Sequence, residues 1–118
     1  MILFFGYKNC SSCRSAEKFL AAHQVDYRFV DITTAPPSPE LLTQYVKTSG
    51  LDVKKFLNTS GEVYRSLGLK DKLASLKDND IIELLASNGR LLKRPLIADA
   101  EGQVVTVGGK EETLKAWL

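Results

Sequence analysis

Residues 2–31 carry the pattern that most constrains the fold of this chain. A short apolar run at 2–6 is followed by apolar residues at helical spacing over 11–23 and by a second β-prone run at 27–31. A strand, a helix and a strand in this order form a βαβ unit, in which the strands are parallel and the crossover is right-handed. The chain is therefore expected to belong to the α/β class.

The rest of the chain is expected to form a helical segment and then a second sheet segment. Ser38-Pro39-Glu40 is a typical helix start, and Gly50 is a typical stop for that helix. Further elements follow: helices at 52–57, 62–67 and 78–87, a turn at 58–61, a hairpin of strands 96–98 and 103–107, and a closing helix at 111–118. The predicted order is β-α-β, helices, β-β-α.

Cys10 and Cys13, the two cysteines of the chain, follow the first strand and fall on the first turn of the predicted helix. Residues three apart on a helix share one face, with Cβ atoms roughly 5–6 Å apart, so a disulfide can close with little backbone movement. The N-terminus of a helix also favours a thiolate over a thiol. A CxxC pair placed in this way is typical of redox proteins.

Three other interpretations of the pair stay open at this point. The cysteines could be two inert buried thiols, or they could form a static disulfide, although a four-residue loop closes little chain entropy. A structural zinc site needs four ligands, and beyond the pair the chain offers only His23. His23 falls at the end of the first helix, where a structural role is expected, and no metal site is predicted.

Composition and charge exclude several classes of function. A chain of 118 residues with net charge +2 is expected to be one monomeric domain with no nucleic-acid partner. No apolar run is long enough to span a membrane, and residues 1–6 do not resemble a signal peptide. A cytoplasmic location without a membrane partner is therefore expected, and there a CxxC pair is more often catalytic or sensing than structural.

Three blocks resemble one bacterial family in the same order along the chain. They are Tyr7-Lys8-Asn9-Cys10-Ser11-Ser12-Cys13-Arg14, then 56–61 with 64–69, and finally Lys93-Arg94-Pro95-Leu96-Ile97. Over essentially the whole chain the sequence resembles the arsenate reductase/Spx (ArsC-like) family, and most of all its uncharacterised CxxC-containing arsenate-reductase-like members. The resemblance implies a thioredoxin-like four-stranded mixed sheet in a single domain, 1–118. Its redox core would be about 1–34 and 93–118, with a helical insert at about 35–92.

The cysteines receive distinct roles. Cys10 is expected to be the nucleophile because it lies at the helix start, and Cys13, one turn further in, is expected to resolve the mixed disulfide. Lys8 and Arg14 flank the pair and are candidates to stabilise the thiolate or an anionic substrate, the alternative being solvated surface charges.

The third block adds two more candidate site residues. The resemblance implies that Pro95 follows a cis peptide bond and faces the cysteines. It also implies that Arg94 faces the cysteine loop, the segment 7–13 that carries both cysteines, and binds an oxyanion or a sulfenate. The alternative is an ion pair at the strand edge. No cofactor is expected to be bound, and an external thiol reductant such as thioredoxin, glutaredoxin or glutathione is implied.

Departures from the family pattern leave several functions open. Where related arsenate reductases have two further arginines, this chain has Asn58 and, approximately, Val107; Cys13 replaces a small hydroxyl residue. We therefore expect an oxidoreductase, and first of all a thiol–disulfide redox protein acting on thiol or disulfide partner proteins. The first alternative is an Spx-like redox-switched regulator that binds the C-terminal domain of the RNA polymerase α subunit, and the second is a thiol-dependent reductase of arsenate or another small oxyanion.

Overall fold

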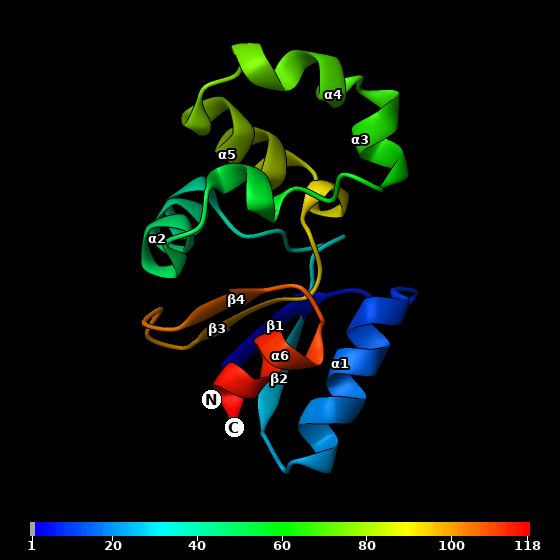
Figure 1. The fold of residues 1–118 in the computed structure, drawn as a ribbon, viewed down its shortest axis with the longest axis vertical. Coiled ribbons are helices and arrows are strands. Elements are labelled where there is room, and N and C mark those ends of the chain that lie inside the picture. Colours follow the sequence, from blue (N-terminus) through cyan, green and yellow to red (C-terminus); the bar gives the residue numbers. More distant parts are fainter. Residues whose placement is uncertain (1) are drawn as a thin grey trace.

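A four-stranded mixed sheet forms the centre of the protein, in a computed structural model that describes residues 2–118 (Figure 1). The strands are β1 (Ile2–Gly6), β2 (Tyr27–Asp31), β3 (Leu96–Asp99) and β4 (Val105–Val107), in the order β2-β1-β3-β4. β1 and β2 are parallel, whereas β3 runs antiparallel to both β1 and β4. The predicted fold class, with a βαβ half and a ββα half, is confirmed.

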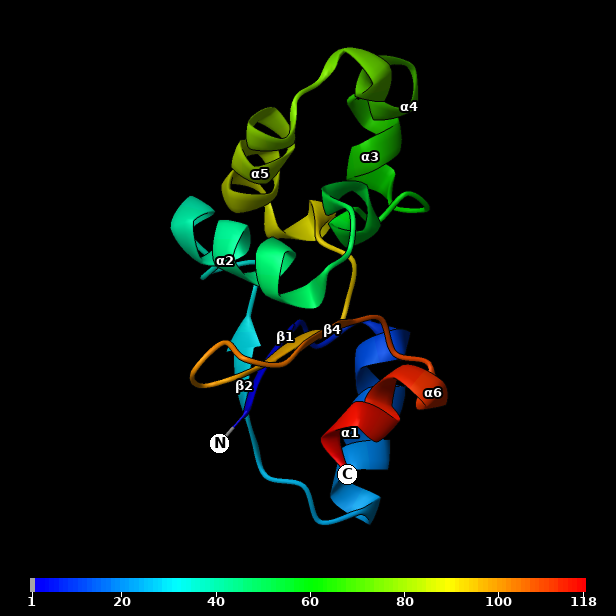
Figure 2. The ribbon, with the colours of Figure 1, turned by 60° about the vertical axis from the view of Figure 1, so that its left-hand side comes forward.

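Helices cover both faces of this sheet. The first face is covered by α1 (Ser11–Ala22) and α6 (Glu111–Leu114), and the second lies beneath a lobe of helices (Figures 1 and 2). The lobe contains α2 (Pro39–Ser49), α3 (Glu62–Ser66), α4 (Leu69–Lys72) and α5 (Asp78–Ser87), with 3₁₀ turns at Val53–Phe56, Leu73–Ser75 and Gly89–Leu91. None of the helices among residues 2–118 has the length and apolar character needed to cross a membrane.

The predicted helix boundaries follow from local capping. The Ser38 hydroxyl accepts a hydrogen bond from the Leu41 N–H at 3.2 Å, and Pro39 opens α2. Gly50 ends α2 in the left-handed region, at φ +70°. In the same way the Asp52 carboxylate caps the next turn by accepting from the Lys54 N–H at 2.9 Å.

The predicted boundaries of the second hairpin strand and of the last helix are wrong. The strand expected from 103 begins only at Val105, because Asp99 Oδ1 accepts from the Gln103 and Val104 N–H groups at 2.6 and 3.2 Å and folds these residues into the turn. α6 ends at Leu114 and continues as a 3₁₀ turn at Lys115–Trp117. α4 was not predicted from the sequence, because its four residues are too few to show helical periodicity.

Side chains alternate between the two faces of the sheet. Phe4 and Ile97 are paired across β1 and β3 and point towards α1 and α6, where they pack with Leu20 and Leu114. The neighbouring pair, Phe5 and Leu96, points to the opposite face and joins the core of the lobe. Both cysteines belong to the first of these cores.

The base of the lobe is closed by backbone pairing between the segment that follows α2 and the segment that returns to the sheet. Leu57 bridges Leu92, and the Lys93 N–H donates to the Phe56 carbonyl at 2.7 Å. Gly89 lies so close to the backbone of Ile32 that a Cβ there would be 2.0 Å from the Ile32 carbonyl oxygen. These contacts fix the path of the chain into Arg94 and Pro95.

Candidate active site

Cys10 occupies the N-cap position of α1 in an extended backbone conformation, with φ −93° and ψ 114°. Its Sγ accepts a hydrogen bond from the Cys13 N–H at 3.2 Å, and its own N–H donates to the Tyr7 carbonyl at 3.3 Å. The sulfur therefore does what a serine or aspartate oxygen does in an ordinary cap. Cys10 thus lies at the positive end of the helix dipole.

Cys13 lies one turn deeper and is fully buried, whereas Cys10 keeps 8% of its surface exposed. Burial raises the pKa of the Cys13 thiol to about 12, and its hydrogen bond to Cys10 and the charge of Cys10 act in the same direction. The Tyr7 backbone and Arg94 act weakly against this rise. Both thiols are free, so the structure shows the reduced pair. At neutral pH Cys13 stays protonated and can donate to the Cys10 sulfur.

The Arg94–Pro95 peptide bond is cis, as the family resemblance implies. Pro95 is buried, and Gly109 lies between it and Ser12 of the cysteine loop: a Cβ placed on Gly109 would be 3.1 Å from the Ser12 carbonyl oxygen and 3.3 Å from Pro95 Cδ. The Arg94 guanidinium lies 4.3 Å above the centre of the Tyr7 ring, a cation–π contact with a residue of the cysteine loop. The structure thus places Arg94 and Pro95 against this loop.

Lys8 and Arg14 lie elsewhere around the loop. Both are exposed, and Arg14 Nε donates to the Lys8 carbonyl at 3.0 Å, which braces the loop that enters α1. They line a hollow with Glu17 and Phe29 that does not include Arg94. The structure therefore does not bring these two cations together with Arg94.

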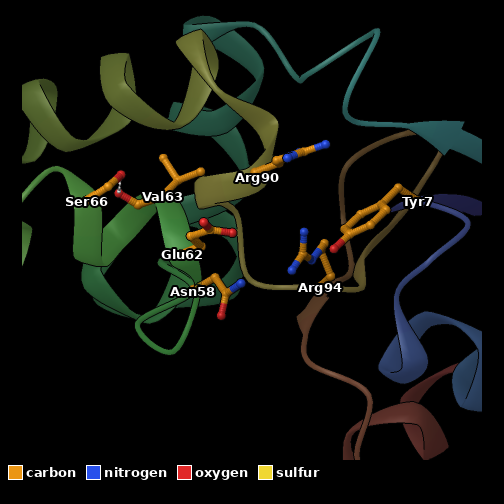
Figure 3. A pocket seen from close by; sticks show the side chains of 8 residues that line it. Tyr7, Asn58, Glu62, Val63, Ser66, Arg90 and Arg94 are labelled. Atoms are coloured by element: carbon orange, nitrogen blue, oxygen red, sulfur yellow. Dashed lines mark hydrogen bonds between the residues drawn. The ribbon is translucent and has the colours of Figure 1, made fainter.

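A cavity of about 360 Å³ lies between the lobe and the sheet (Figure 3). Tyr7 and Arg94 line it from the side of the sheet, and the lobe contributes Asn58, Glu62 and Arg90 (Figure 3). Asn58 thus shares a cavity with Arg94, at a position where the resemblance expects an arginine. Sequence reasoning missed Arg90, because nothing in the local pattern around it indicates that the returning chain brings it opposite Arg94.

A second hollow, of about 530 Å³, is here called the basic groove. It is lined by residues of four segments: Ser12 and Ser15 of α1, 93–94 before β3, 107–110 from the last residue of β4 onwards, and Thr113 of α6. It contains Val107, the other position at which the resemblance expects an arginine. Lys93 and Lys110 supply cations here that sequence reasoning did not assign to the site; the adjacent Lys93-Arg94 pair was the only local signal.

The fold and the site define an α/β protein with a CxxC pair at the start of its first helix, and comparison with known proteins identifies its family. A model of the ArsC family matches residues 5–117, and the chain belongs to this family. It is 47% identical to the "Uncharacterized protein YusI" of Bacillus subtilis (strain 168) over 111 residues, which cover 94% of this chain and 92% of that protein.

Two further relatives show how broad the family is. The "Global transcriptional regulator Spx" of Streptococcus pyogenes serotype M1 is 30% identical over 118 residues, 100% of this chain and 85% of that protein. A crystal structure of a "putative ArsC family related protein from Bacteroides fragilis" superposes with a TM-score of 0.93 at 40% identity, covering 99% of this chain and 97% of that one. The chain therefore has the ArsC/Spx-type thioredoxin-like fold with a CxxC pair.

Proposed function

We propose that this protein is a thiol–disulfide redox protein in which Cys10 is the nucleophile and Cys13 is the resolving thiol. The observation that supports this best is the unequal environment of the two sulfurs. Cys10 Sγ caps α1 and Cys10 keeps 8% of its surface exposed, while Cys13 is fully buried and its pKa is raised to about 12. This difference fits a pair in which one thiol attacks first and the other follows.

The proposed reaction has two exchange steps. The Cys10 thiolate attacks one sulfur of a substrate disulfide, a bond from Cys10 Sγ to that sulfur forms, and the other substrate sulfur leaves as a thiolate that takes up a proton. Cys13 then loses its proton to solvent and attacks Cys10 Sγ. The second substrate thiol is released and the Cys10–Cys13 disulfide forms. Two electrons pass from the dithiol to the substrate, and an external thiol reductant restores the dithiol.

The environment of Cys13 sets the order of these steps. While Cys10 is a thiolate, its charge adds to burial in keeping the pKa of Cys13 high, so Cys13 does not compete as the attacking thiol. Once Cys10 is bonded to substrate, this charge is gone and Cys13 loses a proton more readily. The resolving step should therefore follow the first step and not precede it.

The neighbouring residues have supporting roles in this proposal. Arg94, held over Tyr7, supplies positive charge beside the reacting sulfurs, and the buried Pro95 shapes the surface on which substrate lies. Lys8 and Arg14 add positive charge from the other side of the loop, but both are exposed to solvent and Arg14 Nε donates to the Lys8 carbonyl. Their effect on the rate should be smaller than that of Arg94.

Turnover of a small disulfide by the reduced chain, with dithiothreitol as the regenerating thiol, tests the proposal. Wild-type protein should reduce the disulfide catalytically, and Cys10→Ser should give only the rate of free dithiothreitol. Without dithiothreitol, the reduced Cys13→Ser variant should stop at a mixed disulfide on Cys10, detected by mass. Turnover by Cys10→Ser equal to that of wild type, or an adduct on Cys13, would refute these roles.

A second candidate is a redox-switched regulator. It is favoured by the 30% identity to a protein named global transcriptional regulator Spx over all 118 residues. In this role the oxidised and reduced pair would differ in affinity for the C-terminal domain of the RNA polymerase α subunit. We expect measurable disulfide exchange and no tight binding of that domain. Low-micromolar binding that depends on the redox state, with no turnover, would favour the regulator.

Reduction of arsenate or a similar oxyanion is the third candidate, and the charges around Arg94 disfavour it. A tetrahedral dianion in the cavity of Figure 3 would meet Arg94 and Arg90 but also the Glu62 carboxylate, and it would meet an amide at Asn58. Charge compensation is thus incomplete where the family pattern would supply more arginine. Arsenate-dependent oxidation of dithiothreitol should be no faster in the presence of the protein than in its absence.

A further inference from the structure

The two hollows that share Arg94 differ in charge. The cavity of Figure 3 holds the Glu62 carboxylate opposite its arginines. In the basic groove, Lys93, Arg94 and Lys110 are accompanied by the hydroxyls of Ser12, Ser15 and Thr113, and among residues 2–118 no acidic side chain lines it. The first hollow is electrically mixed, whereas the second presents one sign of charge beside the cysteine loop.

Two adjacent glycines, Gly108 and Gly109, line the groove, and their lack of side chains leaves room for a second chain. Gly108 has φ +101°, a conformation that side chains rarely adopt, and a Cβ on it would lie 3.7 Å from Lys93 Cε. Gly109 lies against Ser12 and Pro95. The end of the Lys93 stem therefore lies over Gly108, and the groove begins at Ser12, one of the two residues between the cysteines.

Contacts with the core and with β4 hold α6, one side of the groove, in place. Leu114 of α6 is buried in the core that also contains both cysteines, and Trp117 Nε1 donates to the Thr106 hydroxyl of β4 at 2.9 Å. These contacts fix Lys110 and Thr113 relative to α1. The charged ends of Lys93 and Lys110 are exposed, so they can pair with groups of a bound molecule.

From these observations we infer that the basic groove binds the substrate segment next to its reactive cysteine, and that it selects segments in which aspartate or glutamate flanks this cysteine. The inference rests on the proposed function, because a bond from Cys10 to the substrate brings the flanking residues over Ser12. An extended chain advances about 3.3 Å per residue, so a carboxylate two or three residues away can reach Lys93 or Lys110. Acidic protein disulfides are thus the substrate class.

Three peptides with one cysteine each, joined to 2-mercaptoethanol as a neutral disulfide, test this inference. Their flanking residues are glutamate, glutamine or lysine. The measured quantity is the second-order rate of mixed-disulfide formation with the Cys13→Ser chain, followed by mass. Each rate is divided by the rate of the same peptide with dithiothreitol, which removes differences in intrinsic reactivity.

At low ionic strength the glutamate peptide should react about 10-fold faster than the lysine peptide, with the glutamine peptide between them. The ratio should approach one at about 0.5 M salt, because screening removes the attraction. The double variant K93E/K110E should reverse the order, and Lys110→Gln alone should shift it in the same direction by less.

The matched control is K70E/K72E, which makes the same change in net charge on exposed residues of α4, a lobe helix that contributes no residue to the groove. It should keep the wild-type order. Equal rates for all three peptides, or the same reversal in K70E/K72E, would overturn the inference while the proposed function stands. If no peptide reacts faster with Cys13→Ser than with Cys10→Ser, the proposed function and the inference both fail.

Discussion

The two faces of the sheet differ in what they contain: one carries the cysteines and the other carries the larger apolar core. The face covered by α1 and α6 has a small core, which includes Phe4, Leu20 and Leu114, and both cysteines are part of it. The face under the lobe has the larger core, built mainly from residues between β2 and β3 together with Phe5 of β1 and Leu96 of β3, and it contains neither cysteine. Chemistry is therefore expected on one face, while much of the buried apolar surface that stabilises the fold lies on the other.

The largest effect expected from this division is on chemistry alone. Cys10→Ser should reduce disulfide exchange to the rate without protein. Serine is itself a good N-cap, so the free energy of unfolding should change by less than about 1 kcal/mol. Exchange rates and urea unfolding of the same preparation measure both quantities. A large loss of stability would show that the cysteine holds the fold together and that the two faces are not separate.

The reverse effect is expected from the lobe. Phe56 is fully buried in its core, and Phe56→Ala should lower the free energy of unfolding by about 3–5 kcal/mol. The rate at which the remaining folded protein is alkylated at Cys10 should stay at the wild-type value. Leu51→Ala, at a site 40% exposed, is the control and should change stability by less than about 0.5 kcal/mol. Slower alkylation of Cys10 in the folded Phe56→Ala variant would contradict the separation between the two faces.

Gly6→Ala probes the point at which the sheet touches the resolving thiol. The added Cβ would lie 2.7 Å from Cys13 Sγ and 3.1 Å from Phe4 Cε1, so the substitution should cost about 1–3 kcal/mol. It should also slow the release of a mixed disulfide, because Cys13 has to move. Gly61→Ala in the lobe places its Cβ 2.7 Å from the mobile end of the Asn58 side chain and should cost less. Equal costs in the two variants would contradict this account.

The smallest effect concerns stability at alkaline pH. The folded protein raises the pKa of Cys13 from 9.0 to about 12, so above pH 9 the unfolded chain loses a proton that the folded chain keeps. The contribution of this thiol to stability is complete below pH 9 and is lost as the pH rises towards 12. Tyr27 and Tyr45, whose pKa values are also raised, act in the same direction. Cys13→Ala should therefore show a shallower fall between pH 9 and 11 than wild type, and identical slopes would contradict the buried thiol.

The sequence predicts best those elements that local chemistry determines. The capping of α2 by Ser38 and Pro39 and its end at Gly50 follow from neighbouring residues, and so does the placement of the cysteines at the start of α1. The late start of β4 depends on a hydrogen bond from the backbone to Asp99, which periodicity does not show.

The candidate site could be predicted only in part for a related reason. The cysteine loop is one continuous segment, and the family resemblance supplies Arg94 and Pro95. Arg90 reaches the cavity of Figure 3 through the chain that returns from the lobe, and Lys110 reaches the basic groove through the packing of α6. Both depend on tertiary contacts between segments that are distant in sequence.

The central claim is that Cys10 and Cys13 act together as one redox pair. Equilibration of the reduced chain in a series of glutathione buffers, followed by acid quenching and intact mass measurement, tests it most directly. The account predicts one two-electron transition from the dithiol to an intramolecular Cys10–Cys13 disulfide, with glutathione bound to Cys10 only as a minor species. A chain that stays reduced in the most oxidising buffer, or that accumulates glutathione on both cysteines independently, would contradict it.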